Sequence, residues 1–327
     1  MADIEKDLVI GIDVGGTGTK IGIVNARGEI LARDESIKTR EHKTFKSFLD
    51  AMDKVIKNLI AQTESEGRIR GIGIGAPNGN YYDGTIVDAP NLIWKGVLHL
   101  ADDFSAKTGI PVRVTNDANA AAIGEGTYGI AKGMKNYIVI TLGTGVGSGI
   151  VINGELVYGC DGFAGELGHT TIVRGKEGRK CGCGRKGCLE TYCSATGVAR
   201  TAKEMLRKSK EASELRKIKG RDITSKDVYD AAKKGDKIAK EIFKYTGTLL
   251  GEAIADFIAF SSPEAIVLFG GLTKSGRYIL DPIKKAVDKN VLNIFKGKAQ
   301  ILLSQMKDSD AAILGASALA WEIGDNA

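Results

Sequence analysis

The sequence has few prolines, cysteines, histidines and aromatic residues, and it has no long apolar run. Its 327 residues include 5 prolines, 5 cysteines and 3 histidines, and 6% of them are aromatic. No stretch approaches the roughly 20 apolar residues of a membrane span, and the acidic residues 1–7 do not resemble a secretory signal. Five cysteines in such a chain do not indicate a disulfide framework. We therefore expect a cytoplasmic protein that does not enter a membrane.

A concentrated charge of one sign is also missing. The net charge of +6 arises from 46 basic and 40 acidic residues, and the excess is scattered through segments such as 203–221. This pattern is typical of solvated helix faces and does not predict a nucleic-acid partner. The length and the 43% hydrophobic content are those of a globular protein with room for two domains.

The common phosphate-binding signatures are absent as well. There is no Gly-x-x-x-x-Gly-Lys-Ser/Thr loop and no His-Arg-Asp loop of protein kinases. Residues 71–76 match a degenerate dinucleotide fingerprint, but Pro77 and Asn78 break the chain where the helix of that fold would start. Any bound phosphate must therefore be held in another way.

Glycine, with 43 residues, is abundant and lies mainly in apolar, strand-like runs. Residues 12–24 alternate like a strand on both sides of a turn of glycines and threonines, which predicts a β-hairpin. Such a turn lets backbone N–H groups approach an anion. Asp13 beside it suits Mg²⁺, bound directly or through water. Alone, the segment could equally be an ordinary glycine-rich hairpin.

The same pattern occurs a second time, at residues 140–153. Asp13 aligns with Thr141, Gly15 with Gly143, and Asn25 with Asn153. A repeat at this separation indicates a duplicated domain, with each half offering a hairpin to a shared cleft. Two facing hairpins around one polyphosphate are the arrangement of actin-like ATPases and sugar kinases.

The remaining chain alternates helices and strands. We expect helices at 45–60, 98–108 and 120–126, a mostly helical stretch at 194–261, and a final helix at 311–323. Strands are expected at 70–76, 111–115, 265–269 and 300–303. Gly270 and Gly271 follow one of these strands and give the backbone a second close approach to a ligand. No linker separates the halves, so the hinge is expected near residues 118–122.

Cys181, Cys183 and Cys188 form the sharpest local signal. They lie within eight residues, in a loop whose Lys180 and Arg185 make it exposed, so scattered buried cysteines explain them poorly. With His169 they provide a tetrahedral ligand set typical of a structural Zn²⁺ site. Cys160 and Cys193 have no such partners, and we interpret both as ordinary buried thiols.

Asp117 is the candidate general base. Polar groups at a strand end, above a helix N-terminus, are where α/β folds place chemistry, and phosphoryl transfer needs one carboxylate to accept the acceptor's proton. Asp117 could instead be a helix N-cap, a role that Asn116 and Asn119 could equally fill.

Several polar groups near the metal loop suit a polyhydroxylated ligand. Glu166 and His169 are spaced to face one side of a turn, and Glu190 follows the last cysteine of the loop. A metal on one imidazole nitrogen would fix the other as a donor to a ligand hydroxyl. Asn91 and Trp94 lie in a turn-rich loop that either contacts a sugar or simply contains a buried tryptophan.

On these motifs the chain resembles the ROK family of repressors and sugar kinases, most closely its bacterial glucokinase-type members. The resemblance covers nearly the whole length and rests on the motifs at 13–17, 116–119, 142–147, 166–169 and 181–190. Many relatives read Pro-Gly where this chain has Pro77-Asn78. Repressors of the family carry a helix-turn-helix domain before the first hairpin, and the dozen residues before Asp13 are too few for one.

The resemblance implies an α/β, actin-like (ribonuclease H-like), duplicated two-domain ATPase fold with a cleft between the domains. The small domain would comprise residues 1–118 and 308–327, and the large domain residues 119–307.

The resemblance also implies a homodimer or homotetramer, and Zn²⁺ on His169, Cys181, Cys183 and Cys188. It implies sugar contacts from Asn91, Asn116, Asp117, Glu166, His169 and Glu190, with Asp117 as the base. The residues for ATP and Mg²⁺ lie in the two hairpins and after the later strand: Asp13, Gly15, Gly16, Thr17, Thr19, Lys20, Thr141, Gly143, Thr144, Gly145, Gly270 and Gly271.

The leading hypothesis is ATP-dependent phosphorylation of the 6-hydroxyl of a hexose, most readily glucose. The alternatives are a kinase for N-acetylglucosamine, N-acetylmannosamine, mannose or fructose and, more distantly, a non-catalytic sugar sensor. The sequence leaves the sugar rank order open, and it leaves the phosphoryl donor open between ATP and polyphosphate.

Overall fold

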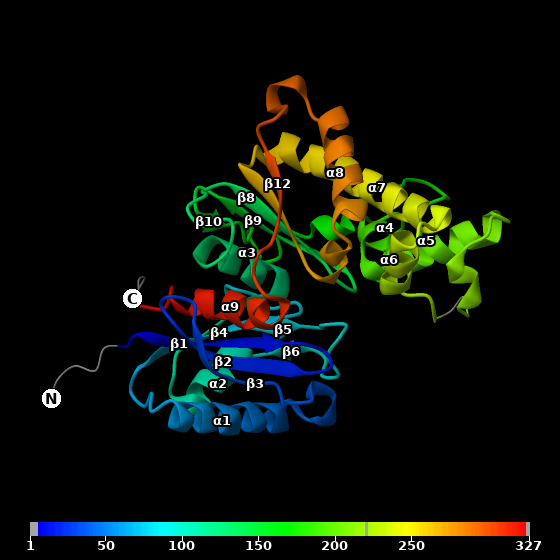
Figure 1. Cartoon of the computed structure of the whole chain (residues 1–327). Coiled ribbons are helices and arrows are strands. Elements are labelled where there is room, and N and C mark those ends of the chain that lie inside the picture. The colour runs from blue at the N-terminus through cyan, green and yellow to red at the C-terminus, as the bar shows by residue number, and fades with distance from the viewer. Residues whose placement is uncertain (1–5, 220–221, 325–327) are drawn as a thin grey trace.

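The computed structural model describes residues 6–219 and 222–324, in which two five-stranded sheets form separate halves of the molecule (Figure 1). The first sheet has the order β3-β2-β1-β4-β7. Its strands are β1 (Leu8–Val14), β2 (Thr19–Asn25), β3 (Ile30–Asp34), β4 (Ile69–Ala76) and β7 (Val112–Asn116). β1 and β2 form the expected antiparallel hairpin, while β1, β4 and β7 run parallel.

The second sheet repeats this topology strand for strand. Its order is β10-β9-β8-β11-β12, with an antiparallel β8–β9 hairpin beside the parallel strands β8, β11 and β12. These strands are β8 (Tyr137–Leu142), β9 (Val146–Ile152), β10 (Glu155–Leu156), β11 (Ala265–Phe269) and β12 (Gln300–Leu303). The internal repeat predicted from the two glycine-rich segments is therefore confirmed.

Helices α1 (Phe45–Gln62) and α2 (Leu100–Thr108) belong to the first half. The Thr44 side chain caps α1 by accepting from the Ser47 N–H. Phe48 and Met52 on the buried face of α1 join the core beneath the first sheet. Trp94 is 7% exposed, lies 4.8 Å from the Phe48 ring and donates to the His42 carbonyl. Trp94 is thus a core residue, as one of the two interpretations of its loop predicted.

The second half contains the larger core, in which helices pack beside the second sheet. Gly247 and Gly251 of the long helix bring its backbone close to Ile279 and Ile283 of the next. These helices are α4 (Glu190–Cys193), α5 (Ala195–Lys208), α6 (Ser225–Lys233), α7 (Lys237–Ser261) and α8 (Arg277–Asn290). The short elements are β5 (Ile86–Val87), β6 (Val97–Leu98), η1 (Thr39–Glu41), η2 (Leu167–His169), η3 (Glu214–Lys217), η5 (Gly271–Ser275) and η6 (Asn293–Phe295).

Helices α3 (Asp117–Thr127) and α9 (Asp308–Ala320) connect the halves and lie between the two sheets (Figure 1). α3 follows β7 of the first sheet but packs on β8 and β9 of the second, whereas α9 follows β12 of the second and packs on β1 and β4 of the first. The two helices also pack on each other. The chain therefore changes sheets twice, at α3 and at α9. The predicted domain limits stay a prediction.

Some expected boundaries differ from the structure. α3 begins at Asp117 rather than at residue 120, because the Asn116 side chain accepts from the Ala118 N–H and caps the helix there. The final helix spans Asp308–Ala320 rather than 311–323. Within the described residues, we find no helix of the length and apolar character that crossing a bilayer demands.

Candidate active site

The first hairpin turn, residues 15–18, is a tight backbone loop at the end of β1. The Gly15 N–H donates to the Gly18 carbonyl, 3.1 Å away. A Cβ on Gly16 would lie 2.5 Å from the Asn91 carbonyl oxygen, so only glycine lets the Asn91 loop lie against this turn. Asp13 pairs with Lys20 across the hairpin, directly beneath the turn. The structure thus brings Asn91 to the turn although 75 residues separate it from Gly16.

The two threonines of this hairpin have different surroundings. Thr17 is exposed in the turn, whereas Thr19 is 1% exposed. The Thr19 hydroxyl lies 3.0 Å from the Thr39 hydroxyl, and one donates to the other. The Thr19 hydroxyl is therefore engaged inside the protein, and the assignment of Thr19 to the nucleotide site stays a prediction.

The second hairpin turn, residues 143–146, lies at the end of β8. The Gly143 N–H donates to the Gly145 carbonyl at 3.1 Å, and the Thr141 hydroxyl accepts from the Gly147 N–H at 3.1 Å. Thr144 is exposed. Gly270 approaches the Leu142 backbone so closely that a Cβ there would lie 2.8 Å from its carbonyl oxygen, and Gly270 has a φ of 104°. The second turn and Gly270-Gly271 are thus neighbours.

Asp117 lies just beyond the carboxyl ends of β4 and β7, where Ala76 pairs with Asn116. Its side chain is solvent-accessible, although protein surrounds it closely enough that burial raises its pKa. One Asp117 carboxylate oxygen accepts from the Ala118 N–H at 2.8 Å, which partly counteracts the rise in the pKa.

Asp13 is close enough to Asp117 for the charge of Asp117 to affect its pKa. Burial, followed by the negative charge of Asp117, raises the pKa of Asp13 to about 6, against a smaller opposing effect of Lys20. Two carboxylates that are difficult to ionise together create a place for a cation. The first turn and the strand ends therefore combine backbone donors with paired acidic groups.

Glu166, His169 and Glu190 come together on the second half. The His169 Nε2 atom is 4.0 Å from a Glu166 carboxylate oxygen. Burial is the main effect that raises the pKa of Glu166. The neighbouring His169 lowers this pKa, while the negative charges of Asp117 and Glu190 raise it further. The charges of Asp117 and Glu190 thus act on Glu166, although the three carboxylates come from separate segments. Asn116 lies beside them, but its side-chain oxygen caps α3.

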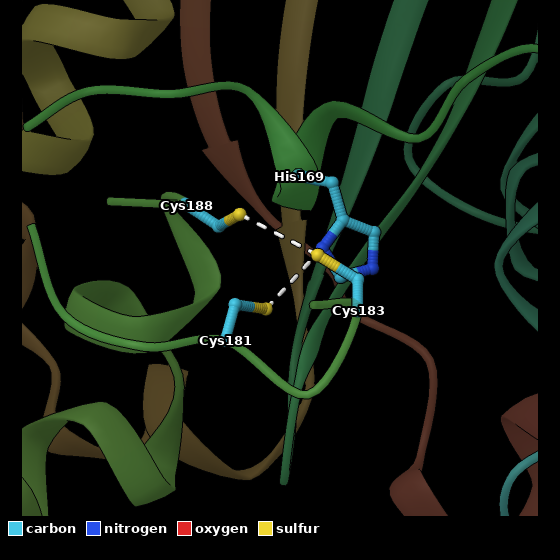
Figure 2. A group of neighbouring side chains, drawn as sticks. All are labelled: His169, Cys181, Cys183 and Cys188. Carbon is cyan, nitrogen blue, oxygen red and sulfur yellow. Dashed lines mark hydrogen bonds between the residues drawn. The ribbon is translucent and has the colours of Figure 1, made fainter. Parts of the chain in front are cut away.

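The three cysteines and His169 converge on one point (Figure 2). Their ligand atoms all lie within 4.8 Å of one another. His169 Nδ1 is 3.6 Å from Cys181 Sγ, and the sulfur atoms of Cys183 and Cys188 are 3.7 Å apart. The predicted four-residue cluster is therefore present.

The donor chemistry of this cluster fits a Zn²⁺ ion. Three sulfur atoms and one imidazole nitrogen at these separations need only small shifts to reach tetrahedral coordination. Burial raises the pKa of Cys181 to about 12, and a divalent cation would reverse this by stabilising the thiolate. His169 would then present its Nε2 atom toward Glu166.

The two other cysteines differ from each other. Cys193 is fully buried, as expected, but Cys160 is exposed, so its interpretation as a buried thiol is wrong. Cys160 lies in the irregular segment after β10, where the Tyr82 hydroxyl donates to the neighbouring Gly159 carbonyl. The sequence gives no hydrophobic periodicity in this segment that could have revealed the exposure.

One residue with a structural role at this site was missed from the sequence. Arg179, two positions before Cys181, is 6% exposed and bonds to α4 and α5. Nothing in the sequence distinguishes it from Arg174 or Arg185 in the same charged loop, both of which are exposed. Its partners are separated from it by 12 or more residues, and only the folded chain reveals them.

Comparisons with known proteins agree with this geometry. The model of the ROK family matches residues 9–323. The chain is 38% identical to a glucokinase of Halalkalibacterium halodurans over 94% of its own length and 92% of that protein. It is also similar to the structure of a ROK-family glucokinase from Streptomyces griseus in complex with glucose and AMPPNP. That likeness has a TM-score of 0.78, 35% identity, and coverage of 96% of this chain and 99% of that one.

A regulator of the same family is similar as well. The structure of a ROK-family transcriptional regulator, a homologue of the E. coli MLC protein, gives a TM-score of 0.85 and 26% identity, covering 97% of this chain and 78% of that one. These likenesses and the two matching sheets confirm the expected actin-like two-domain fold. The family model spans nearly the whole chain, and the chain therefore belongs to the ROK family.

Proposed function

We propose that the protein is an ATP-dependent glucokinase, which transfers the γ-phosphoryl group to the 6-hydroxyl of glucose. The observation that carries the proposal is the position of Asp117, an accessible carboxylate of raised pKa within electrostatic reach of Asp13 and Glu166. The similar H. halodurans protein is named a glucokinase, and the S. griseus structure holds glucose and AMPPNP.

In this proposal Asp117 accepts the proton of the 6-hydroxyl as that oxygen attacks the γ-phosphorus. Its raised pKa makes it a stronger base than an ordinary aspartate. Asn91, Asn116, Glu166, His169 and Glu190 hold the sugar hydroxyls. Phosphoryl transfer depends mainly on such positioning and on charge stabilisation.

The two hairpin turns hold the phosphates in this proposal, with Lys20 and the exposed Thr17 and Thr144 beside their backbone N–H groups. Gly270 and Gly271 admit the remainder of the nucleotide. Asp13 would hold Mg²⁺, which supplies positive charge to the transferring group. We further assign Zn²⁺ to His169 and the three cysteines.

We also infer a homodimer or homotetramer in the cytoplasm, where ATP is available and thiols stay reduced. The activity assay described below also tests polyphosphate as an alternative phosphoryl donor.

The second candidate function is a sugar sensor without catalysis, which the likeness to the transcriptional regulator favours. Against it, Asp117 and both hairpins are intact, and a sensor needs neither a base nor two phosphate turns. Within the kinases, the alternative substrates are N-acetylglucosamine, N-acetylmannosamine, mannose and fructose.

The test is a coupled ADP-release assay with Mg-ATP and each of these sugars, with an Asp117→Asn variant beside the wild type. We expect turnover on glucose, and a kcat reduced about a hundredfold to ten-thousandfold in the variant, the usual contribution of a general base. Sugar binding, measured by calorimetry, should persist in the variant because asparagine keeps the shape and one acceptor oxygen.

Each other outcome has a definite meaning. Turnover on another sugar keeps the mechanism and changes the substrate. Undiminished turnover in Asp117→Asn contradicts the base assignment. Sugar binding with no turnover on any sugar, using either ATP or polyphosphate, contradicts the kinase proposal and supports the sensor.

A further inference from the structure

Glu190 lies at the junction of the metal-binding loop and the second hairpin turn. One carboxylate oxygen accepts from the Val146 N–H at 3.0 Å, and the other is 3.8 Å from the Cys181 Sγ atom, which donates to it. A Cβ on Gly145 would lie only 2.3 Å from the Glu190 oxygen, so the carboxylate lies directly against the turn. The side chain proposed to hold sugar thus also bonds to the turn proposed to hold phosphate.

The helices that begin at Glu190 make further bonds to the same turn. The Ala195 N–H donates to the Gly143 carbonyl at 2.9 Å, and the Thr196 hydroxyl donates to the Thr144 carbonyl at 2.8 Å. The Ser194 hydroxyl donates to the Glu190 carbonyl at 2.7 Å and thereby joins α4 to α5. The turn is therefore held from one side by a continuous segment, residues 190–196.

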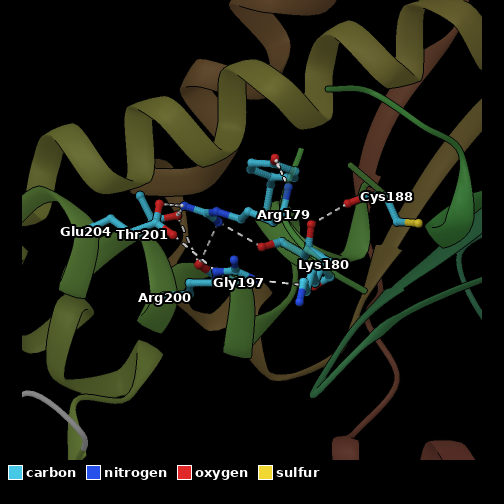
Figure 3. Close-up of polar contacts among 9 residues, drawn as sticks. Arg179, Lys180, Cys188, Gly197, Arg200, Thr201 and Glu204 are labelled. Carbon is cyan, nitrogen blue, oxygen red and sulfur yellow. Dashed lines mark hydrogen bonds and ion pairs between the residues drawn. The ribbon is translucent and has the colours of Figure 1, made fainter. Parts of the chain in front are cut away.

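Arg179 fixes the metal-binding loop to these helices (Figure 3). Its guanidinium donates to the Thr191 carbonyl at 2.8 Å, the Thr201 hydroxyl at 2.9 Å and the Glu204 carboxylate at 2.6 Å. It also lies over the Tyr192 ring, 4.3 Å from the centroid. A buried arginine with this many partners holds its neighbours in one arrangement, because moving any of them leaves a charge poorly paired.

We propose that Glu190 is a positioning residue for the phosphate-binding turn, and that the metal-binding loop, fixed by Arg179, holds Glu190 in place for this role. The sugar and nucleotide sites are then coupled through one carboxylate rather than only through closure of the two halves. The inference rests on the proposed function for the identity of the ligands, but it concerns the geometry of the turn.

The decisive measurement is the Kd for Mg-AMPPNP in the absence of sugar, by calorimetry, for Glu190→Ala and Glu190→Gln. Alanine removes the acceptor for the Val146 N–H, whereas glutamine keeps an acceptor oxygen. We expect a Kd about three- to tenfold weaker for Glu190→Ala, since one hydrogen bond that orders the turn is lost. The Kd of Glu190→Gln should be unchanged or tighter.

The direction of the change in the AMPPNP Kd distinguishes the loss of the hydrogen bond from the loss of the negative charge. Removing a negative charge near a polyanion should tighten binding in both variants, so weakening in alanine alone is specific to the lost acceptor. Glu166→Ala is the matched control, because no hydrogen bond found in the described chain joins the Glu166 side chain to either turn. This control should bind sugar less tightly, and its AMPPNP Kd should be unchanged or tighter.

Two further experiments change groups that lie apart from the proposed nucleotide site. Arg179→Lys keeps the charge but loses the forked geometry, and chelator-treated protein loses any metal from the loop. Both should weaken AMPPNP binding in the same direction as Glu190→Ala. Circular dichroism would verify that each protein is folded, and the Glu190 pair remains decisive if either of these two proteins unfolds.

The outcomes distinguish this inference from the proposed function. A wild type that phosphorylates glucose, together with a Glu190→Ala variant of unchanged AMPPNP affinity, overturns the coupling alone. Equal weakening in Glu190→Ala and Glu190→Gln also overturns it, because the acceptor would then be irrelevant. A wild type that binds no AMPPNP and transfers no phosphoryl group overturns both.

Discussion

Asp13 is a residue whose ionised side chain destabilises the ligand-free protein. Its carboxylate is partly enclosed beside Asp117, and its pKa rises from 3.8 to about 6. Because the folded state then holds the proton more tightly than the unfolded state, the cost of ionisation is absent below about pH 4 and complete above about pH 6. A bound cation would remove that cost, which is why such residues occur at binding sites.

Asp13→Asn should therefore stabilise the ligand-free protein at pH 7 to 8. The shift in the Asp13 pKa corresponds to about 2–3 kcal/mol in the free energy of unfolding, part of it owed to Asp117. Urea unfolding at several pH values would measure this, with the gain disappearing as the pH falls from about 6 to about 4. Asp7→Asn is the control of opposite sign, because its bond to Arg68 lowers the Asp7 pKa. A stabilisation that does not change with pH would contradict the account.

At the scale of elements, the crossing of α3 and α9 depends on two glycines. A Cβ on Gly124 would lie 2.7 Å from the Gly315 Cα atom, and a Cβ on Gly315 would lie 2.7 Å from the Ala120 carbonyl oxygen. The backbones of the helices are therefore in contact, at the place where the chain passes between the two sheets. The hinge expected at residues 118–122 includes Ala120, which contacts this crossing.

Gly315→Ala should destabilise the protein although alanine favours helices. Helix propensity favours alanine over glycine by about 1 kcal/mol, but overpacking at a backbone contact costs about 2–3 kcal/mol. We expect a net loss of about 1–2 kcal/mol in the free energy of unfolding. Gly271→Ala, where a Cβ meets nothing within 4 Å, is the matched control and should change stability little. Equal stability of Gly315→Ala and wild type would show that the crossing can relax.

At the scale of the whole molecule, a further contact joins the two halves beside α3 and α9. Tyr81 stacks on Tyr158 with ring centroids 3.9 Å apart and an interplanar angle of 12°. The Asn80 side-chain amide donates to the Asp161 carbonyl at 2.7 Å, and the Tyr82 hydroxyl donates to the Gly159 carbonyl at 2.6 Å. The chain beyond Asp161 leads directly to Glu166 and His169, so this contact can influence the sugar site.

Asn80→Ala should lower stability and raise the KM for glucose more than it lowers kcat. Asn80 is 5% exposed, and losing its amide leaves the Asp161 carbonyl without that donor, at a cost of about 1–3 kcal/mol. Steady-state kinetics and urea unfolding would check both effects. Asn136→Ala removes an amide that bonds to Asn153 within the second half only, so it should lower stability without changing KM. The same rise in KM for both variants would contradict a role for the contact between the halves.

The sequence determined the features that depend on local patterns. Alternating apolar residues around glycine-rich turns predicted both hairpins, and their similarity predicted a duplicated domain, which the two sheets of matching topology confirm. The cysteine spacing predicted a four-residue cluster that the fold assembles. The roles of Asp117 and the sugar-contacting residues stay predictions from the family resemblance.

Only the tertiary structure decided which side chains meet across long separations. It buried Thr19 against Thr39, exposed Cys160, assigned the helix cap to Asn116, and brought Glu190 to the Val146 N–H across 44 residues of chain. It also enclosed Arg179 between α4 and α5. Periodicity and turn chemistry act over a few residues and can be read directly from the sequence. A hydrogen bond between distant segments exists only because packing of the whole core fixes where their backbones lie.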